Sequence, residues 1–285
     1  MIKFGYWVIV ALLLPIAYSQ PIDLIGEATA GGLMRGQVKA TDKVYLDDQP
    51  VMVTEKGTFA FGFPRDAATT AKLKIVSEKG EIQQQILNLK PREFKIQRID
   101  GLPDAKVNPK KPELLARIAK DVAEVKKART TRSQQQAFFG QFIWPAAGEI
   151  TGEYGSQRIL NGEPKSPHYG LDIAGPVGSV VIAPADGVIT LAVPDMYYSG
   201  GTLILDHGDG INSTFLHLSK LLVKSGQSVK QGQLIAKMGS TGRATGPHLD
   251  WRINWFDVRL DPALLMKGQP PQKLSIHNNF WKQHD

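Results

Sequence analysis

The stretch from Gly239 to Asp250 most constrains how this chain can fold, because two earlier segments make chemical sense only if they lie against it. It reads Gly-Ser-Thr-Gly-Arg-Ala-Thr-Gly-Pro-His-Leu-Asp. Successive side chains of an extended strand alternate between faces, so His248 and Asp250 point to one side and the leucine between them points to the other. The sequence therefore predicts an imidazole beside a carboxylate on one face of a strand.

The two earlier segments supply more side chains that can bind metals or transfer protons. They are His168-Tyr-Gly-Leu-Asp172 and Phe215-Leu-His217-Leu. His168 and Asp172 are four residues apart and share a face in either a strand or a helical turn. Together with Asp250 they form a candidate set of three metal ligands, and His217 and His248 remain as unliganded imidazoles. Three ligands and an open position are what a catalytic zinc requires.

The composition indicates a folded protein without thiol chemistry. The chain has 285 residues, of which 42% are hydrophobic and none is cysteine. This size and hydrophobic content predict one or two packed domains. The lack of cysteine excludes a Cys nucleophile, a thiolate zinc site, a lipoprotein thiol and a disulfide framework.

Residues 1–19 have the features of a secretory signal peptide. Lys3 precedes an apolar run from Tyr6 to Ile16, and a small-x-small pattern ends at Ser19. The run is shorter than the roughly 20 residues of a membrane span, so we expect cleavage near Gln20 rather than a stable transmembrane anchor. Without Lys3 the balance is 33 basic against 27 acidic residues, or +6. We therefore expect a periplasmic or cell-envelope protein with an anionic envelope polymer as its partner rather than nucleic acid.

Residues 20–102 are predicted to form a small antiparallel β-sandwich, because six or seven short strand-like runs are separated by turn signals. The region contains no histidine. Its role is either to bind or position, or to shield the domain that follows. The strand-like runs begin at Gly36, Val44, Pro50, Thr58, Lys72, Gln85 and Phe94.

Residues 103–139 are predicted to connect two domains. The run from Pro103 to Pro112 is rich in proline and lysine, which favours an extended connector. An amphipathic helix follows, and residues 130–137 are polar enough for a flexible hinge. The basic face of the helix either contacts an anionic surface or is the solvated face of a linker helix packed on a neighbouring domain. The apolar positions of this helix are Leu114, Leu115, Ile118, Val122 and Val125.

Residues 140–266 are predicted to form an all-β domain, and residues 267–285 a tail. Short apolar runs alternate with glycine-containing turns, and no long helical pattern interrupts them. The chain as a whole is therefore predicted to be mainly β, with one linker helix.

The motifs of this second domain resemble the LytM/lysostaphin-type zinc metalloendopeptidases, which cut peptide crosslinks of bacterial peptidoglycan and include DD-endopeptidases. Each motif alone is weak, but together they cover about 125 residues in the order of the family. They are Gly152-Glu-Tyr-Gly-Ser-Gln-Arg158, His168-Tyr-Gly-Leu-Asp172, Ala183-Pro-Ala-Asp-Gly187, His207-Gly-Asp-Gly, Phe215-Leu-His217-Leu, Val229-Lys-Gln-Gly, and Gly239 through Asp250.

The resemblance implies one zinc ion per catalytic domain and a division of roles among the site residues. It implies that His168 and Asp172 are ligands, and that His217 and His248 are catalytic imidazoles. The third ligand of the family is the second histidine of a His-x-His pair, and here Asp250 stands at that position. A carboxylate is a competent zinc ligand, although a second anionic ligand makes bound water less acidic and favours a harder metal.

Several other interpretations compete with an active peptidase. Family members that have lost ligands act as noncatalytic activators of cell-wall amidases, so a cell-wall amidase or an envelope scaffold protein is a candidate partner. A pure peptidoglycan-binding module gives no reason for these His and Asp residues to coincide. Tyr154 and Arg158 are weaker candidates for the substrate groove. We expect His207, in a hairpin turn, to be structural.

Overall fold

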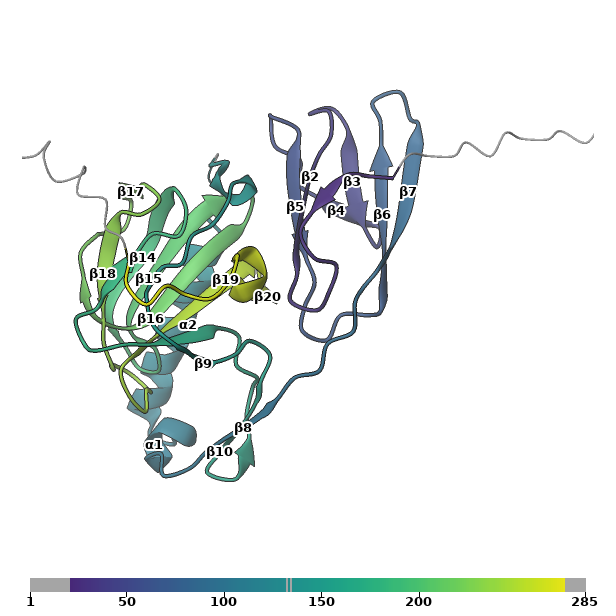
Figure 1. Cartoon of the computed structure of the whole chain (residues 1–285). Coiled ribbons are helices and arrows are strands. Elements are labelled where there is room, and N and C mark those ends of the chain that lie inside the picture. The colour runs from purple at the N-terminus through teal and green to yellow at the C-terminus, as the bar shows by residue number, and fades with distance from the viewer. Residues whose placement is uncertain (1–20, 132, 134, 275–285) are drawn as a thin grey trace, which may run out of the picture.

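The structure, a computed structural model, describes residues 21–131, 133 and 135–274. The predicted signal peptide and most of the predicted tail, with His277 and His284, lie outside the described residues. Within those residues no helix has the length and hydropathy needed to cross a membrane. The prediction of a mainly β protein with a single long helix is confirmed (Figure 1).

The N-terminal module is a sandwich of two small antiparallel sheets (Figure 1). One sheet has the strand order β1-β2-β5 and the other β4-β3-β6-β7. Side chains from both sheets form one core, in which Phe59, Phe61 and Leu73 are fully buried. The strands are β1 Leu24–Ile25, β2 Leu33–Gln37, β3 Lys43–Leu46, β4 Gln49–Val51, β5 Thr58–Gly62, β6 Thr70–Val76 and β7 Ile82–Asn88.

Strand β5 joins this module to the C-terminal domain because both of its faces are buried. Phe59 and Phe61 face the core of the module, whereas Ala60 belongs to the core of the other domain. The backbone N–H of Ala60 donates a hydrogen bond to the Asp209 carboxylate at 3.0 Å. The two domains therefore share a packed interface.

The last strand predicted for the module pairs elsewhere. β8 (Ile96–Ile99) lies parallel to β10 (Gln157–Leu160) of the C-terminal domain, and β11 (Glu163–Pro164) completes this small sheet. Parallel pairing joins segments far apart in sequence, so the local pattern that identified β8 as a strand could not identify its partner. The end of the predicted N-terminal module is thereby held against the C-terminal domain.

The predicted linker helix is α2 (Pro112–Arg129), which follows the short helix α1 (Asp104–Val107). Proline at its start, Glu113 in its first turn and basic residues in its last turn suit the free N–H groups and the dipole of a helix. Its C-terminal part packs on the sheet of the C-terminal domain, where Ala128 contacts a cluster with Leu191 and Ile204. The helix is thus a packed element with one solvated side.

The C-terminal domain is built on a ten-stranded sheet whose main order is β17-β14-β15-β16-β19-β12-β9. One face of this sheet covers the largest core, which includes Phe215, Leu249 and Trp251. Two short 3₁₀ helices are η1 Ala137–Phe139 and η2 Pro262–Leu265. The strands are β9 Ile150–Gly152, β12 Leu171–Ala174, β13 Val180–Ile182, β14 Gly187–Met196, β15 Gly200–Gly208, β16 Ile211–Leu221, β17 Ser228–Val229, β18 Leu234–Met238, β19 His248–Trp255 and β20 Val258–Leu260.

Candidate metal centre

The register of two neighbouring strands places two carboxylates side by side. β12 and β19 are antiparallel, and Asp172 lies directly opposite Asp250. Ile173 and Leu249, the next pair, point to the core. Because side chains alternate along a strand, both aspartates project from the opposite face of the sheet.

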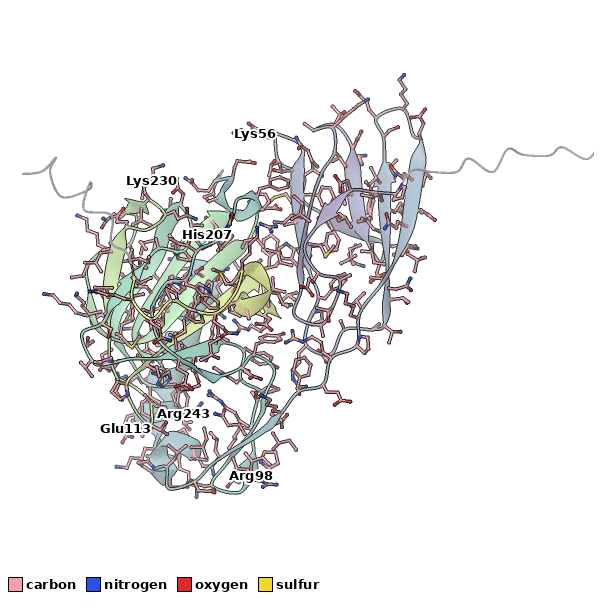
Figure 2. The ribbon with its side chains drawn as sticks, in the orientation of Figure 1. Lys56, Arg98, Glu113, His207, Lys230 and Arg243 are labelled. Atoms are coloured by element: carbon pink, nitrogen blue, oxygen red, sulfur yellow. The ribbon has the colours of Figure 1, made fainter. Side chains whose placement is uncertain are left out.

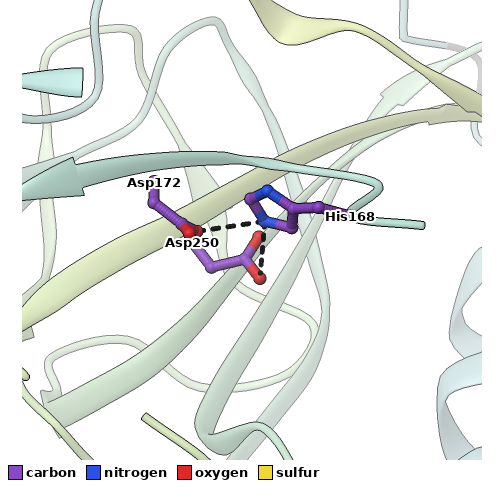
Figure 3. Close-up of side chains that lie close together, drawn as sticks. All are labelled: His168, Asp172 and Asp250. Atoms are coloured by element: carbon purple, nitrogen blue, oxygen red, sulfur yellow. Dashed lines mark ion pairs between the residues drawn. The ribbon is translucent and has the colours of Figure 1, made fainter. Parts of the chain in front are cut away.

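His168 completes the cluster from the loop before β12 (Figure 3). Its Nε2 lies 3.1 Å from Oδ1 of Asp172 and 3.5 Å from Oδ2 of Asp250. One potential ligand atom from each of the three residues lies within 4.8 Å of the other two. The structure therefore brings together the three ligands predicted from the sequence.

The surroundings of the cluster fit a divalent metal ion. Both ring nitrogens of His168 and Oδ1 of Asp172 are buried and make no well-oriented hydrogen bond, although Nε2 and Oδ1 are only 3.1 Å apart, and buried polar atoms are rarely left in that state. Gly152 and Gly170 lie so close that a Cβ atom would overlap the carboxylates of Asp172 and Asp250, respectively. An imidazole nitrogen and two carboxylate oxygens form a donor set that zinc accepts.

Arginines compensate for the concentration of negative charge. Arg252 contacts both oxygens of Asp250, with Nε to Oδ1 at 2.9 Å and Nη2 to Oδ2 at 2.6 Å. Nη2 of Arg158 lies 3.5 Å from Oδ2 of Asp172. Sequence analysis missed Arg252, although its position two residues after Asp250 on a strand puts it on the same face.

These contacts determine the protonation of the cluster. Burial opposes ionisation of Asp250, but the Arg252 guanidinium outweighs it and holds the pKa of this carboxyl well below its usual range. Burial would lower the pKa of His168, but the two carboxylates outweigh burial and raise it. A bound cation would take the place of that proton on His168.

A β-bulge brings His217 to the same face. Between Gly201 and Leu203 on β15 there is one residue, whereas the matching part of β16 holds Leu216 and His217. His217 is the extra residue and adopts a left-handed conformation with φ of 64°. Without the bulge, simple alternation would direct its side chain to the core.

His217 and His248 are adjacent, with ring centroids 4.8 Å apart. Nδ1 of His217 lies 2.7 Å from the carbonyl oxygen of Thr241, and Nδ1 of His248 lies 2.9 Å from that of Gly246. A carbonyl oxygen only accepts, so each Nδ1 carries the proton and Nε2 of a neutral ring keeps its lone pair. Burial lowers the pKa of His217 to about 4, so its ring is neutral at pH 7.

A recess of about 140 Å³ lies beside the cluster. Arg158 and Arg243 both line it. The guanidinium of Arg243 lies over the Tyr198 ring, 4.6 Å from its centroid, and Arg243 is found at the same end of the domain as Arg98 (Figure 2). Tyr154 does not line this recess: it is 2% exposed, and its hydroxyl donates to the Arg259 carbonyl. Gln97 and Ile99 of β8, and Leu102 shortly after it, also line the recess.

His207 lies apart from the cluster, near the other end of the domain (Figure 2). Its ring is fully buried, with Nδ1 2.8 Å from the Asp186 carbonyl oxygen and Nε2 2.8 Å from the Ser213 hydroxyl. Both nitrogens are engaged within the fold. The structure thus gives His207 a structural setting.

The fold and this cluster define a metallopeptidase-like β domain, and comparisons with known proteins identify its family. Residues 166–262 match the model of peptidase family M23. A solved structure described as a putative peptidase M23 from Pseudomonas aeruginosa is 30% identical and superposes with a TM-score of 0.63, covering 84% of this chain and 95% of that one. The chain belongs to peptidase family M23.

Two curated relatives match less than half of this chain. Peptidoglycan DD-endopeptidase ShyB of Vibrio cholerae is 42% identical over 113 residues, which are 40% of this chain and 26% of ShyB. Murein hydrolase activator NlpD of Escherichia coli is 34% identical over 119 residues, which are 42% of this chain and 29% of NlpD. The chain therefore spans between a quarter and a third of the length of these two relatives.

Proposed function

We propose that the chain is an exported, metal-dependent endopeptidase that hydrolyses peptide crosslinks of peptidoglycan in the bacterial cell envelope. The observation that carries this proposal is the convergence of His168, Asp172 and Asp250 beside the paired rings of His217 and His248. Membership of family M23 and the similarity to a relative named as a peptidoglycan DD-endopeptidase support it.

In this proposal His168, Asp172 and Asp250 hold one zinc ion. When bound, the ion would act as a Lewis acid and would lower the pKa of a water molecule. His217 is neutral and presents an unprotonated Nε2, so it accepts a proton from the attacking water. His248, with Nδ1 held by Gly246, orients the water or hydrogen-bonds the oxyanion of the tetrahedral intermediate.

A second candidate is a noncatalytic activator of a cell-wall amidase. The bidentate contact of Arg252 with Asp250 favours it, because a guanidinium already engages the third ligand. Residues from β8 also form part of the wall of the recess beside the cluster. One relative is named as a murein hydrolase activator.

Metal content and digestion of purified sacculi separate the two candidates. We expect the protein to bind close to one zinc ion and to release cleaved peptide stems, identified by mass analysis. His217→Ala should abolish cleavage and keep the metal, whereas His168→Ala should lose both. Protein that stays metal-free in the presence of zinc, leaves sacculi intact and stimulates an amidase would instead support the activator.

A further inference from the structure

A second cavity lies between α2 and the sheet, on the face that carries the metal centre. Its volume is about 340 Å³. On its floor, Leu216 and Thr214 of β16 lie opposite Asp250 and Arg252 of β19, and side chains of one such row share a face. Because Arg252 also binds Asp250, the cavity adjoins the candidate metal centre.

One end of this cavity carries more positive than negative charge: Arg129, Arg252 and Arg259 lie there with one exposed carboxylate, Asp257, whose charge favours the charged form of Arg129. Arg129, the last residue of α2, is 7% exposed, and the described residues give its guanidinium no hydrogen bond or ion pair. Arg259 is nearby and donates to Asn254 at 2.7 Å, while Arg252 is engaged by Asp250. Burial, followed by repulsion from Arg259 and Arg252, lowers the pKa of Arg129 to about 8. The guanidinium is therefore still charged at pH 7, but the fold destabilises its charged form.

A second polar group at the cavity also lacks a partner. The Thr214 side chain is 1% exposed, and its hydroxyl has no hydrogen-bond partner among the described residues. Two acidic residues line the cavity as well. Asp121 accepts a hydrogen bond from the backbone N–H of Tyr197, and Asp257 is exposed and forms no ion pair with the described part of the chain. Arg129 and Thr214 are therefore left as donors toward the cavity.

The rest of the lining is mixed: Lys126, Tyr198, Ser199 and Thr202 contribute polar groups, and the hydroxyls of Ser199 and Thr202 are already paired with each other at 2.8 Å, but a large part of the wall is apolar. This apolar part consists of Ile118, Val122 and Val125 from α2, together with Met196 and Leu216 from the sheet. A guanidinium and a hydroxyl match the two oxygens of a carboxylate, and the apolar walls match an aliphatic segment attached to it. Inorganic anions would satisfy the donors but leave the apolar walls without a contact.

We propose that this cavity, the Arg129 subsite, binds a carboxylate on an aliphatic arm of the peptide substrate. The proposal rests on the proposed function, because the cavity and the metal centre occupy one face of one sheet. The subsite would fix the register of such a peptide relative to the metal centre.

Calorimetric titration of the full chain, kept metal-free with a chelator to prevent turnover, tests the subsite. The probes are a stem tetrapeptide, the same peptide with every carboxyl group amidated, and hexanoate. We expect the acid to bind about tenfold more tightly than the amide. Arg129→Gln should remove this preference, and Lys127→Gln, an exposed neighbour on the same helical turn, should keep it.

Three results would overturn the subsite. They are equal binding of acid and amide, an unchanged preference in Arg129→Gln, and hexanoate binding as tight as the tetrapeptide, which would indicate a site for free organic acids. Thr214→Val, a nearly isosteric change, provides a second variant. It should weaken the binding of the acid peptide by about threefold. Thermal unfolding gives a readout without ligand: Arg129→Met should raise Tm because it removes a buried unpaired charge. A lower Tm would mean that Arg129 serves the fold, which also contradicts the proposal.

Digestion of sacculi separates failure of the subsite from failure of the proposed function. If the protein cuts sacculi but shows no Arg129-dependent preference for the acid peptide, the peptidase proposal stands and the subsite proposal is contradicted. If the protein prefers the acid peptide through Arg129 but does not cut sacculi, the subsite stands as a peptide-binding site and the peptidase proposal is contradicted.

Discussion

Arg252 contacts both oxygens of Asp250, at 2.9 and 2.6 Å, and so neutralises one of the three candidate metal ligands. A cation bound by Asp250 would lie close to this guanidinium and be repelled by it. We therefore expect Arg252→Met to raise zinc affinity by about tenfold, or about 1.4 kcal/mol. Titration against a chelator of known affinity measures this change.

The same variant should be less stable without metal. Removing Arg252 leaves Asp250 as a buried carboxylate whose remaining cationic neighbours are His168, at 3.5 Å, and the more distant charge of Arg158, and breaking a buried pair typically costs about 3–5 kcal/mol. Added zinc should restore most of this loss. Weaker zinc binding in Arg252→Met would show instead that Arg252 is needed to orient Asp250.

Two glycines provide a test of the space around the ligands. Gly152→Ala would place a methyl group against the Asp172 carboxylate, whereas the same change at Gly246 meets no atom within 4 Å. We expect Gly152→Ala to lower the affinity for zinc at least tenfold, because displacing one of the three candidate ligands costs more than about 1.4 kcal/mol of binding free energy. Gly246→Ala, which keeps the carbonyl that His248 contacts, should bind zinc as the wild type does. Equal metal content in the two variants would contradict the assignment of Asp172.

The grouping of the candidate ligands could be predicted from the sequence because it depends on local geometry. His248 and Asp250 share a face through strand alternation, and His168 and Asp172 occur in one short motif. His217 is different: it reaches this face only through the bulge in β16, which depends on pairing with β15. The resemblance to a family supplied its role, whereas periodicity alone would direct it to the core.

Features that depend on contacts between distant segments could not be predicted. β8 was expected in the sandwich, yet it pairs with β10 and places Ile99 beside the metal centre. Tyr154 belongs to a motif of the family but is buried by aromatic contacts, including Phe94 at 6.1 Å between ring centroids. The cationic end of the Arg129 subsite likewise exists only because α2 folds onto the sheet.

A buried ion pair between the domains predicts a large effect on stability. Nη2 of Arg92 lies 2.7 Å from Oδ2 of Asp261, a residue that is 4% exposed. Arg92→Ala would leave this carboxylate buried without its cation, and we expect a loss of about 3–5 kcal/mol in urea unfolding. Lys95→Ala is the matched control because the Lys95–Glu153 pair, at 2.8 Å, is exposed and should contribute less than about 1 kcal/mol. Similar losses in both variants would show that the Arg92 contact does not hold the domains together.

Burial of His207 predicts how stability depends on pH. Burial lowers its pKa from 6.5 to about 4, so between these values the unfolded chain binds a proton that the folded chain does not. The contribution of the neutral ring is therefore complete above pH 6.5 and is lost as the pH falls toward 4, at about 1.4 kcal/mol per pH unit. His207→Gln removes this titration and leaves the other histidines in place. The stability difference between wild type and variant, measured by urea unfolding of metal-free protein at pH 7.5, 6 and 5, should shrink at that rate below pH 6.5. A difference that stays constant over this range would mean that His207 accepts a proton in the folded protein as readily as in the unfolded chain.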